Sequence, residues 1–317
     1  MNGKPVLLSG IKPTGEIHIG NYFGAIRQLV SLLSGEEYQG YVMLADYHAL
    51  NFVQDAAEMK RLTQELALTY LACGLDPEKV VLFKQSSVSA HTELAWILDT
   101  ITTMPYLMRA HAFKDAEAKD KEISVGTFNY PMLMAADILL YDTALVPVGQ
   151  DQKQHIEYSR DTAEKFNRIF GETFTLPKEH ILPDVAVVPG TDGQKMSKSY
   201  GNTIPLFASR EVITEKVMGI VTDSGGDRLE NVYAIHKLVK SEDELAPLYE
   251  ANKGQYKVLK EALIEDLDAF IAPMRARYEE LKNDTDSVDA ILEKGGEAAR
   301  AVANAKMEQV RKVIGVN

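Results

Sequence analysis

The first 170 residues alternate between short apolar runs and longer segments whose apolar side chains recur at helical spacing. The apolar runs predict buried strands over residues 4–9, 40–45, 80–83 and 144–148. Between the second and third runs, apolar positions recur every three or four residues, which predicts a helix. Asp55 and Glu58 have the spacing of a capping box at its start, and Gly74 is a natural end. Strands that alternate with helices at this pitch are typical of βαβ units and a parallel sheet.

The rest of the chain has mostly helical periodicity. Residues 92–141 are predicted to be mainly helical, with a charged run from Lys114 to Glu122 that fits a solvated loop or an exposed helical face. An amphipathic helix is predicted over residues 152–170. Farther along, apolar steps of three and four predict a long helix over residues 263–281 and a last helix over residues 298–310.

The change in pattern near residue 202 predicts two domains. We expect residues 1–202 to form an α/β domain, a doubly wound parallel sheet with helices on both faces. Residues 203–317 are expected to form a smaller, all-helical C-terminal domain. A doubly wound sheet binds its ligands at the carboxyl ends of its strands, so the candidate chemistry should lie there.

Composition narrows the possible functions. With 45% hydrophobic and 25% charged residues, the chain has the make-up of an ordinary globular protein. We expect no membrane span and no signal peptide, since the sequence shows no long uncharged apolar stretch. The single cysteine, Cys73, excludes an internal disulfide and a multi-cysteine metal site, so we expect the cytoplasm. A net charge of −12 argues against wholesale binding of a phosphate backbone but allows a local basic patch.

The first candidate site is a glycine-containing segment between a predicted strand and a predicted helix. Its residues are Lys12, Pro13, Thr14, Gly15, Glu16, Ile17, His18, Ile19, Gly20 and Asn21. Backbone N–H groups at a helix start favour phosphate, and the glycines allow the backbone to approach a ligand closely. Taken alone, the segment fits equally well a tight turn in which His18 caps the helix.

The second candidate site is a loop with two lysines three residues apart. Lys195, Met196, Ser197, Lys198 and Ser199 follow a stretch that contains Gly190 and Gly193. Such a loop can close over a triphosphate and bring ammonium groups to the charge that develops on pyrophosphate. The alternative is an exposed basic turn in an acidic protein, and the exact pentapeptide argues against it.

Together, the segments His18–Asn21 and Lys195–Ser199 resemble the two signature motifs of the class I aminoacyl-tRNA synthetases, in the same order. The first motif ends in Asn21 where many members have histidine, and this departure is usual in the tryptophan and tyrosine branch. The resemblance covers nearly the whole chain, and Val221-Thr222-Asp223-Ser224 is its clearest match beyond residue 202. It implies a Rossmann-like nucleotide-binding domain with a helical insertion, followed by a helical anticodon-binding domain.

A third segment favours tryptophan within that branch. Residues 130–141 resemble the helix of the amino-acid pocket, where Asp137 would accept the indole N–H and Met134 would contact the ring. In the tyrosine branch a polar residue commonly replaces Met134. Without the other motifs, a structural carboxylate and plain core packing would be the preferred interpretation of these two residues. His48 is equally compatible with a place beside the indole and with a satisfied core histidine.

A fourth segment, over residues 146–155, resembles the loop that lies beneath the adenosine. Gly149 would allow backbone to approach the ribose, Asp151 would accept its hydroxyls, and Gln152 would reach the amino group of tryptophan. We interpret His155 as a packed histidine on its helix.

The resemblance implies a set of site residues. The catalytic residues would be Lys195, Lys198, His18 and Ser199. ATP would be bound by Lys12, Pro13, Thr14, Gly20, Asn21, Gly149, Gln150, Asp151, Val188, Lys195, Met196, Ser197, Lys198 and Ser199. Tryptophan would be bound by Asp137, Met134, Tyr130, Gln152 and His48.

Two positions depart from the family's pattern. Related enzymes often carry a lysine that holds pyrophosphate a few residues after the equivalent of Phe113, and Ala116 stands there in this chain. Lys12 stands where many bacterial relatives have glutamine. The lysine that completes the phosphate site is therefore left open among Lys12, Lys114 and Lys119.

The function that follows is ATP-dependent loading of L-tryptophan onto tRNA(Trp) through an aminoacyl-adenylate, with Mg²⁺ on the phosphates and a homodimeric enzyme. No metal bound by protein side chains is expected. Tyrosine as substrate is the nearest alternative, and Met134 argues against it. A small-molecule adenylyltransferase would lack the Lys195–Ser199 motif. A non-catalytic tRNA-binding paralogue should have lost His18, Lys195 or Lys198, which are all present.

Overall fold

The computed structural model describes residues 3–110, 113–114, 117, 122–148, 153–181, 188–220 and 230–316. A five-stranded parallel sheet lies at its centre, in the order β3-β2-β1-β4-β5. The strands are β1 (Val6–Ile11), β2 (Gln39–Leu44), β3 (Val80–Lys84), β4 (Leu145–Val148) and β5 (Lys178–Ile181). The strand order reverses direction between β1 and β4, and in such sheets the ligand crevice lies at this switch point. The predicted doubly wound parallel sheet is confirmed.

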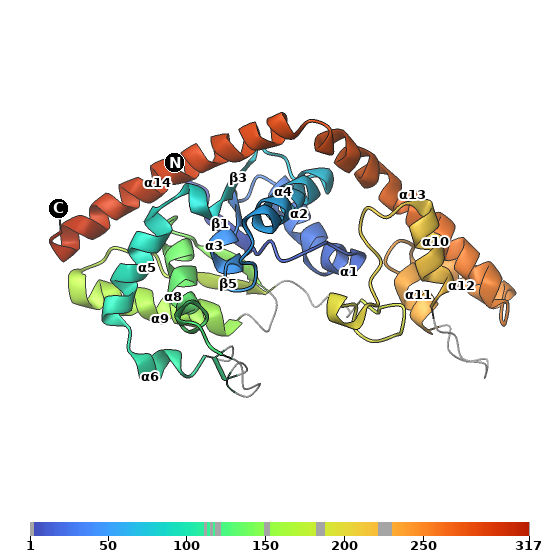
Figure 1. Ribbon diagram of the computed structural model, residues 1–317, viewed down its shortest axis with the longest axis horizontal. Helices are drawn as coiled ribbons and strands as arrows, with labels where there is room; N and C mark the ends of the chain where they lie inside the picture. Colours follow the sequence, from blue (N-terminus) through green and yellow to red (C-terminus); the bar gives the residue numbers. More distant parts are fainter. Residues whose placement is uncertain are drawn as a thin grey trace.

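Helices cover both faces of the sheet (Figure 1). One face packs against α1 (Ile19–Asn21), a π-helical turn η1 (Tyr22–Ile26), α2 (Arg27–Ser34) and α4 (Ala56–Ala72). The other face packs against α5 (Ala90–Ile101), α8 (Val125–Leu139) and α9 (Lys153–Phe170). The short elements α3 (Asp46–Ala49), η2 (Gln85–Ser87) and α6 (Met104–Leu107) complete this part. None of the helices in the described ranges is long and apolar enough to span a lipid bilayer.

In the part of the chain beyond residue 202 that the structure describes, the regular elements are helices, as predicted. They are α10 (Arg210–Met218), α11 (Glu230–His236), α12 (Glu242–Ala251), α13 (Tyr256–Lys282) and α14 (Thr285–Ile314), and a short helix η4 (Lys198–Tyr200) comes just before them. Helices α10 and α11 pack on α13, which also contacts α4. Figure 1 shows α10 to α13 gathered at one end of the molecule, away from α5, α6, α8 and α9.

Local sequence signals place most elements well. Asp55 caps α4 by accepting the N–H of Glu58 at 2.8 Å. The first strand begins two residues later than predicted and runs on to Ile11. Strand β5 was not predicted, because its residues Lys178-Glu179-His180-Ile181 lack an apolar run. Among the described strands it pairs with β4 alone, and an edge strand tolerates such polar residues. Parts of the charged run Lys114–Glu122 lie outside the described residues.

Helix α14 leaves the other C-terminal helices and crosses the free edge of β3 (Figure 1). Its first half contributes Val288 and Leu292 to the hydrophobic core on one face of the sheet. Its second half contributes apolar residues to the core on the opposite face: Ala299, Ala303, Met307 and Val310. By packing, residues 285–314 therefore belong with the sheet, although they follow the predicted boundary at residue 202.

The crossing point is a pair of glycines. A Cβ on Gly295 would lie 1.9 Å from the carbonyl oxygen of Leu82 in β3, and one on Gly296 would lie 3.0 Å from the Cβ of Ser87. Beyond the crossing, Arg300 Nε donates to the carbonyl oxygen of Ser87 at 3.0 Å. The helix thus covers the unpaired edge of β3, where an uncovered strand would invite edge-to-edge association.

We predict that Gly295→Ala destabilises the fold by about 1–3 kcal/mol or more, because the added methyl overlaps the backbone of β3 and forces the helix outward. Gly24→Ala is the matched control, since it also lies in a helical segment but its Cβ would meet nothing within 4 Å. Urea unfolding of both variants measures the difference. Equal stability of the two proteins would show that α14 does not depend on this close approach.

Candidate active site

The two predicted motifs meet at the carboxyl end of β1. The backbone N–H of Ile19 donates to the carbonyl oxygen of Ile204 at 3.0 Å, and the N–H of Leu206 donates to that of Ile17 at 3.0 Å. These bonds join the segment that follows the lysine loop to the segment that opens the first helix. Residues far apart in the sequence are thereby brought to one place on the sheet.

His18 is buried and has a free ring nitrogen. Its side chain is 7% exposed, and Nδ1 has no hydrogen-bond partner among the described residues. A Cβ on Gly20 would lie 2.9 Å from that nitrogen, so the glycine makes room for the ring. Burial, together with the charge of Lys198, lowers the pKa of His18 from 6.5 to about 4. His18 is therefore a neutral group near pH 7 with hydrogen-bonding capacity available for a ligand.

Asn21 has two roles in this arrangement. Its Oδ1 accepts the backbone N–H of His18 at 3.1 Å, which fixes the start of α1. Its Nδ2 is then the group that can donate to a ligand. His18 stands at the N-cap of α1, so the alternative of a helix start capped at this residue is compatible with the structure, and Asn21 supplies the reciprocal bond of a capping box.

Lys198 reaches over Gly15 toward the same place. A Cβ on Gly15 would lie 2.8 Å from Lys198 Nζ, and the φ of 131° at Gly15 is one that L side chains rarely adopt. Desolvation lowers the pKa of Lys198, and the charge of Glu16 opposes this effect. One lysine of the second motif therefore contacts the glycine segment of the first motif directly.

Asn202 holds the lysine loop together. Its Oδ1 accepts the N–H of Ser197 at 2.8 Å, and its Nδ2 donates to Asp192 Oδ1 at 2.7 Å and to the carbonyl oxygen of Lys195 at 3.2 Å. Gly190 allows this, since a Cβ there would lie 2.2 Å from Nδ2 of Asn202. This role has no local sign in the sequence, because a buried asparagine is recognised only from its partners.

The side chains of the pentapeptide alternate between burial and exposure. Met196 is buried in the core, and its N–H donates to the carbonyl oxygen of Val188 at 2.9 Å. Lys195, Lys198 and Ser199 are exposed. Ser197 lies 2.9 Å from Ser199, Oγ to Oγ. The loop is thus fixed at Met196 while both lysine side chains remain available.

Lys12 lies at the mouth of this region, directly after β1. Its Nζ is 5.0 Å from the centre of the Phe52 ring, and desolvation lowers the pKa of Lys12. No ion pair to Lys12 is recorded among the described residues. Pro13 is buried and Thr14 is exposed beside it. Of the other candidate lysines, Lys114 is exposed, whereas Lys119 and Ala116 lie outside the described residues.

Asp137 on α8 is a buried carboxylate that accepts three hydrogen bonds from side chains. It is 2% exposed, and its Oδ1 accepts from Gln85 Nε2 at 2.7 Å and from His91 Nδ1 at 2.6 Å. Its Oδ2 accepts from His48 Nε2 at 2.9 Å. Burial raises the pKa of Asp137, but the bonds and charges of His48 and His91 outweigh it and lower the pKa to about 2. The carboxylate is ionised at neutral pH.

The structure bears on the alternative interpretations of His48 and Asp137, which were a structural role and a role in the amino-acid pocket. His48 is a satisfied, buried histidine and also a partner of Asp137. Asp137 has a structural role, since it links α3, η2, α5 and α8 through these bonds. Met134 lies one helical turn before it on α8 and is half-buried. Gln85 and His91 were not predicted, because neither carries a local signal in the sequence.

Tyr130 begins the same stretch of α8. Its hydroxyl lies 2.8 Å from Nε2 of His155, and its ring lies across that of His48 with centres 6.1 Å apart. His155 is buried, as expected for a packed histidine. Tyr130, His48 and Asp137 therefore form one cluster, while Gly149, Gln150, Asp151, Gln152 and Val221–Ser224 lie outside the described residues.

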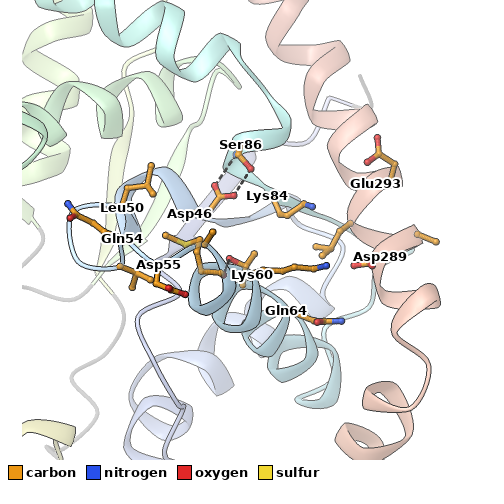
Figure 2. Close-up of a pocket in the computed structure, with 16 residues that line it drawn as sticks. Asp46, Leu50, Gln54, Asp55, Lys60, Gln64, Lys84, Ser86, Asp289 and Glu293 are labelled. Atoms are coloured by element: carbon orange, nitrogen blue, oxygen red, sulfur yellow. Dashed lines mark hydrogen bonds between the residues drawn. The ribbon is translucent and has the colours of Figure 1, made fainter.

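A cavity lies elsewhere, between α4 and α14 (Figure 2). It has a volume of about 1120 Å³, and Lys60 and Lys84 line it together with Asp289 and Glu293 of α14. Asp46 closes one side by accepting the N–H of Ser86 at 2.9 Å. His18, Lys198 and Asp137 do not line this cavity, so its size does not make it the site of the predicted chemistry.

Comparison with known proteins agrees with the geometry. The family described as "tRNA synthetases class I (W and Y)" matches residues 1–293. A tryptophan–tRNA ligase of Fusobacterium nucleatum subsp. nucleatum is 44% identical over 318 residues, covering 98% of this chain and 97% of the relative. One of Rhodopirellula baltica is 46% identical over 319 residues, covering 98% and 99%. The crystal structure of tryptophanyl-tRNA synthetase from Campylobacter jejuni complexed with ADP and tryptophan superposes with a TM-score of 0.91 at 42% identity, covering 98% of this chain and 99% of that one.

The fold and the paired motifs are those of a class I aminoacyl-tRNA synthetase, and the chain belongs to the family of class I tRNA synthetases for tryptophan and tyrosine. Within that family it groups with the tryptophan–tRNA ligases, at 41–46% identity over nearly its whole length.

We predict that His18 makes the protein more sensitive to acid. The unfolded chain binds a proton at this residue below pH 6.5, whereas the folded chain resists it down to about pH 4. Stability should therefore fall as the pH drops between these values, and His18→Asn should lose less. Urea unfolding of both proteins at pH 7 and pH 4.5 measures this. Parallel loss of stability in the two proteins would contradict the lowered pKa.

Proposed function

We propose that the chain attaches L-tryptophan to tRNA(Trp), using ATP and releasing AMP and pyrophosphate. The observation that carries this proposal is the meeting of His18 and Lys198 over Gly15 and Gly20, in a chain that groups with tryptophan–tRNA ligases. A neutral histidine and a partly desolvated ammonium are held in fixed positions. They therefore stabilise the negative charge of a polyphosphate better than mobile water molecules do.

The reaction has two steps. An oxygen of the tryptophan carboxylate attacks the α-phosphorus of ATP, the bond to the β-phosphate oxygen breaks, and pyrophosphate leaves. A hydroxyl of the terminal tRNA ribose then attacks the acyl carbon, AMP leaves, and the hydroxyl proton passes to solvent. The attacking carboxylate is already ionised at pH 7, so the first step requires positioning and charge stabilisation rather than a side-chain base.

The residues predicted for the nucleotide site would divide it between them. His18, Asn21 and Gly20 would contact phosphate from the helix start, and Lys195, Lys198, Ser197 and Ser199 would contact it from the loop. Pro13, Thr14, Val188 and Met196 would shape the site around the nucleotide, and Gly149, Gln150 and Asp151 would follow β4 beneath the adenosine. Lys12, with its lowered pKa, is the candidate for the lysine that Ala116 replaces.

Mg²⁺ would be held by the nucleotide itself. Within the described ranges, no group of three or more His, Cys, Asp or Glu side chains is placed to bind a metal ion. The unpartnered Nδ1 of His18 and the ammonium of Lys198 suit phosphate oxygens, not a cation. When bound, the ion would neutralise charge on the phosphates.

The Asp137 cluster would select the amino acid. An ionised carboxylate is acceptor-only, and the indole N–H is a donor with no acceptor capacity. Oδ2 of Asp137 accepts one bond from His48, so it retains capacity for a second. Met134, Tyr130 and His48 would contact the ring, and Gln152 would contact the amino group. Tyrosine is the alternative substrate, and a thioether at position 134 offers its phenol no strong hydrogen bond.

Three further assignments complete the proposal. Helices α10 to α13 would contact the anticodon, and the net charge of −12 implies local contacts there.

A homodimer would form through α5, α6 and the start of α8, where large apolar side chains are exposed: Trp96 at 71%, Met104 at 67% and Val125 at 80%. The enzyme would act in the cytoplasm, where tRNA and ATP are available.

Removal of the site cations should slow adenylate formation. We predict that Lys195→Ala and Lys198→Ala each lower its single-turnover rate on the order of 10²–10³-fold, because their charges act as pyrophosphate separates. Lys12→Gln should raise the Michaelis constant for ATP. Tryptophan binding, followed by equilibrium dialysis, should stay near wild type in all three. Rates close to wild type would exclude the lysine loop from catalysis.

Replacement of Asp137 tests the amino-acid site. Wild type should exchange pyrophosphate into ATP with tryptophan and not with tyrosine or phenylalanine. It should also reject an analogue whose indole nitrogen is replaced by sulfur, by roughly 10⁴-fold, because a buried acceptor is then left unpaired. In Asp137→Ala the ratio of kcat/KM for the two substrates should collapse while ATP binding persists. An unchanged ratio would limit Asp137 to a structural role.

A further inference from the structure

A second layer of buried side chains stands behind Asp137. His91 at the start of α5 is fully buried, and its ring bridges two groups. Nδ1 lies 2.6 Å from Asp137 Oδ1, and Nε2 lies 2.9 Å from the hydroxyl of Tyr141. The ring also stacks on Phe83 of β3, with centres 6.2 Å apart. His91 is therefore held on both nitrogens and on one face.

These contacts fix the orientation of the His91 ring. The carboxylate of Asp137 can only accept, so His91 Nδ1 carries a proton and donates to Oδ1. The hydroxyl of Tyr141 holds the other ring nitrogen, Nε2, at 2.9 Å. The ring is therefore tied at both nitrogens, which fixes its position against Asp137.

The hydrogen bonds also distinguish the two carboxylate oxygens of Asp137. Oδ1 accepts from both Gln85 and His91, so its two in-plane positions are occupied. Oδ2 accepts from His48 alone among the described residues. The remaining acceptor position of Asp137 is therefore on Oδ2, the oxygen on the side of His48 and Tyr130.

We propose that His91, held by Tyr141, is a positioning residue that sets the specificity for tryptophan. It fixes the rotation of the Asp137 carboxylate so that the free position of Oδ2 faces the indole N–H. This inference rests on the proposed function. His91 touches neither tryptophan nor ATP, and it acts only through Asp137.

The test measures pyrophosphate exchange with tryptophan and with the sulfur analogue in three variants. His91→Leu removes both hydrogen bonds, and the tryptophan-to-analogue ratio of kcat/KM should fall roughly 10- to 100-fold, with an unchanged KM for ATP. His91→Asn keeps a donor near the place of Nδ1 and should retain more of the ratio. Tyr141→Phe keeps the histidine but frees its ring, and the ratio should fall between the two.

The matched control is His236→Leu. His236 is another fully buried histidine with the same kind of partners, Asp266 Oδ2 at 2.8 Å and the hydroxyl of Tyr249 at 3.1 Å. It lies on α11, outside the cluster around Asp137. Its replacement should lower the melting temperature without changing the ratio, which separates loss of stability from loss of selectivity.

The outcomes are distinguishable. If wild type shows no tryptophan-dependent exchange, the proposed function fails. If wild type is active and Asp137→Ala changes the ratio, while His91→Leu and Tyr141→Phe keep it at the wild-type value, the positioning role alone is overturned. If His91→Leu does not fold, Tyr141→Phe and His91→Asn decide: a lowered ratio in Tyr141→Phe supports the inference, and wild-type ratios in both overturn it.

Discussion

A buried negative charge must be surrounded by donors, and the requirement of Asp137 organises the centre of this molecule. An unpaired carboxylate in a core costs several kcal/mol, so its partners cannot be lost individually without penalty. Here the partners come from α3, which follows β2, and from η2 and α5, which follow β3. Gln85 extends the arrangement, since its Oε1 accepts the N–H of Tyr47 at 3.1 Å. The charge of Asp137 thus links four elements, and the same bonds keep the carboxylate ionised.

The lysine loop follows a different principle. Lys195 and Lys198 are exposed, while Met196 and Asn202 fix the backbone of the loop. In the proposed function, selectivity would rest on the buried cluster around Asp137, whereas catalysis would rest on the exposed lysines. The glycines at positions 15 and 20 serve both parts, because they bring Lys198 and His18 against the backbone that a phosphate would approach.

What the sequence predicted depends on how local the signal is. The strand at residues 40–45 and the cap at Asp55 follow from neighbouring residues, and both are present. The two motifs could be found because their residue types are unusual at that spacing. Of the partners of Asp137, His48 was predicted through the family resemblance, but Gln85 and His91 could not be found, since they lie 52 and 46 residues away and have no distinctive neighbourhood. Gly295 belongs to the same class, because a glycine inside a helix reveals its purpose only when the strand beneath it is known.

The path of α14 over the edge of β3 has a consequence for the order of events during synthesis. The contact between Arg300 and Ser87 joins residues 213 positions apart, so the sheet edge stays uncovered until nearly the whole chain has been made. At about 5–20 residues per second, this interval is roughly 10–40 s. During that time the nascent chain carries a bare strand edge beside two incomplete cores. Its greatest exposure to misassociation therefore falls on the ribosome, before the final helix arrives, and not in the finished enzyme.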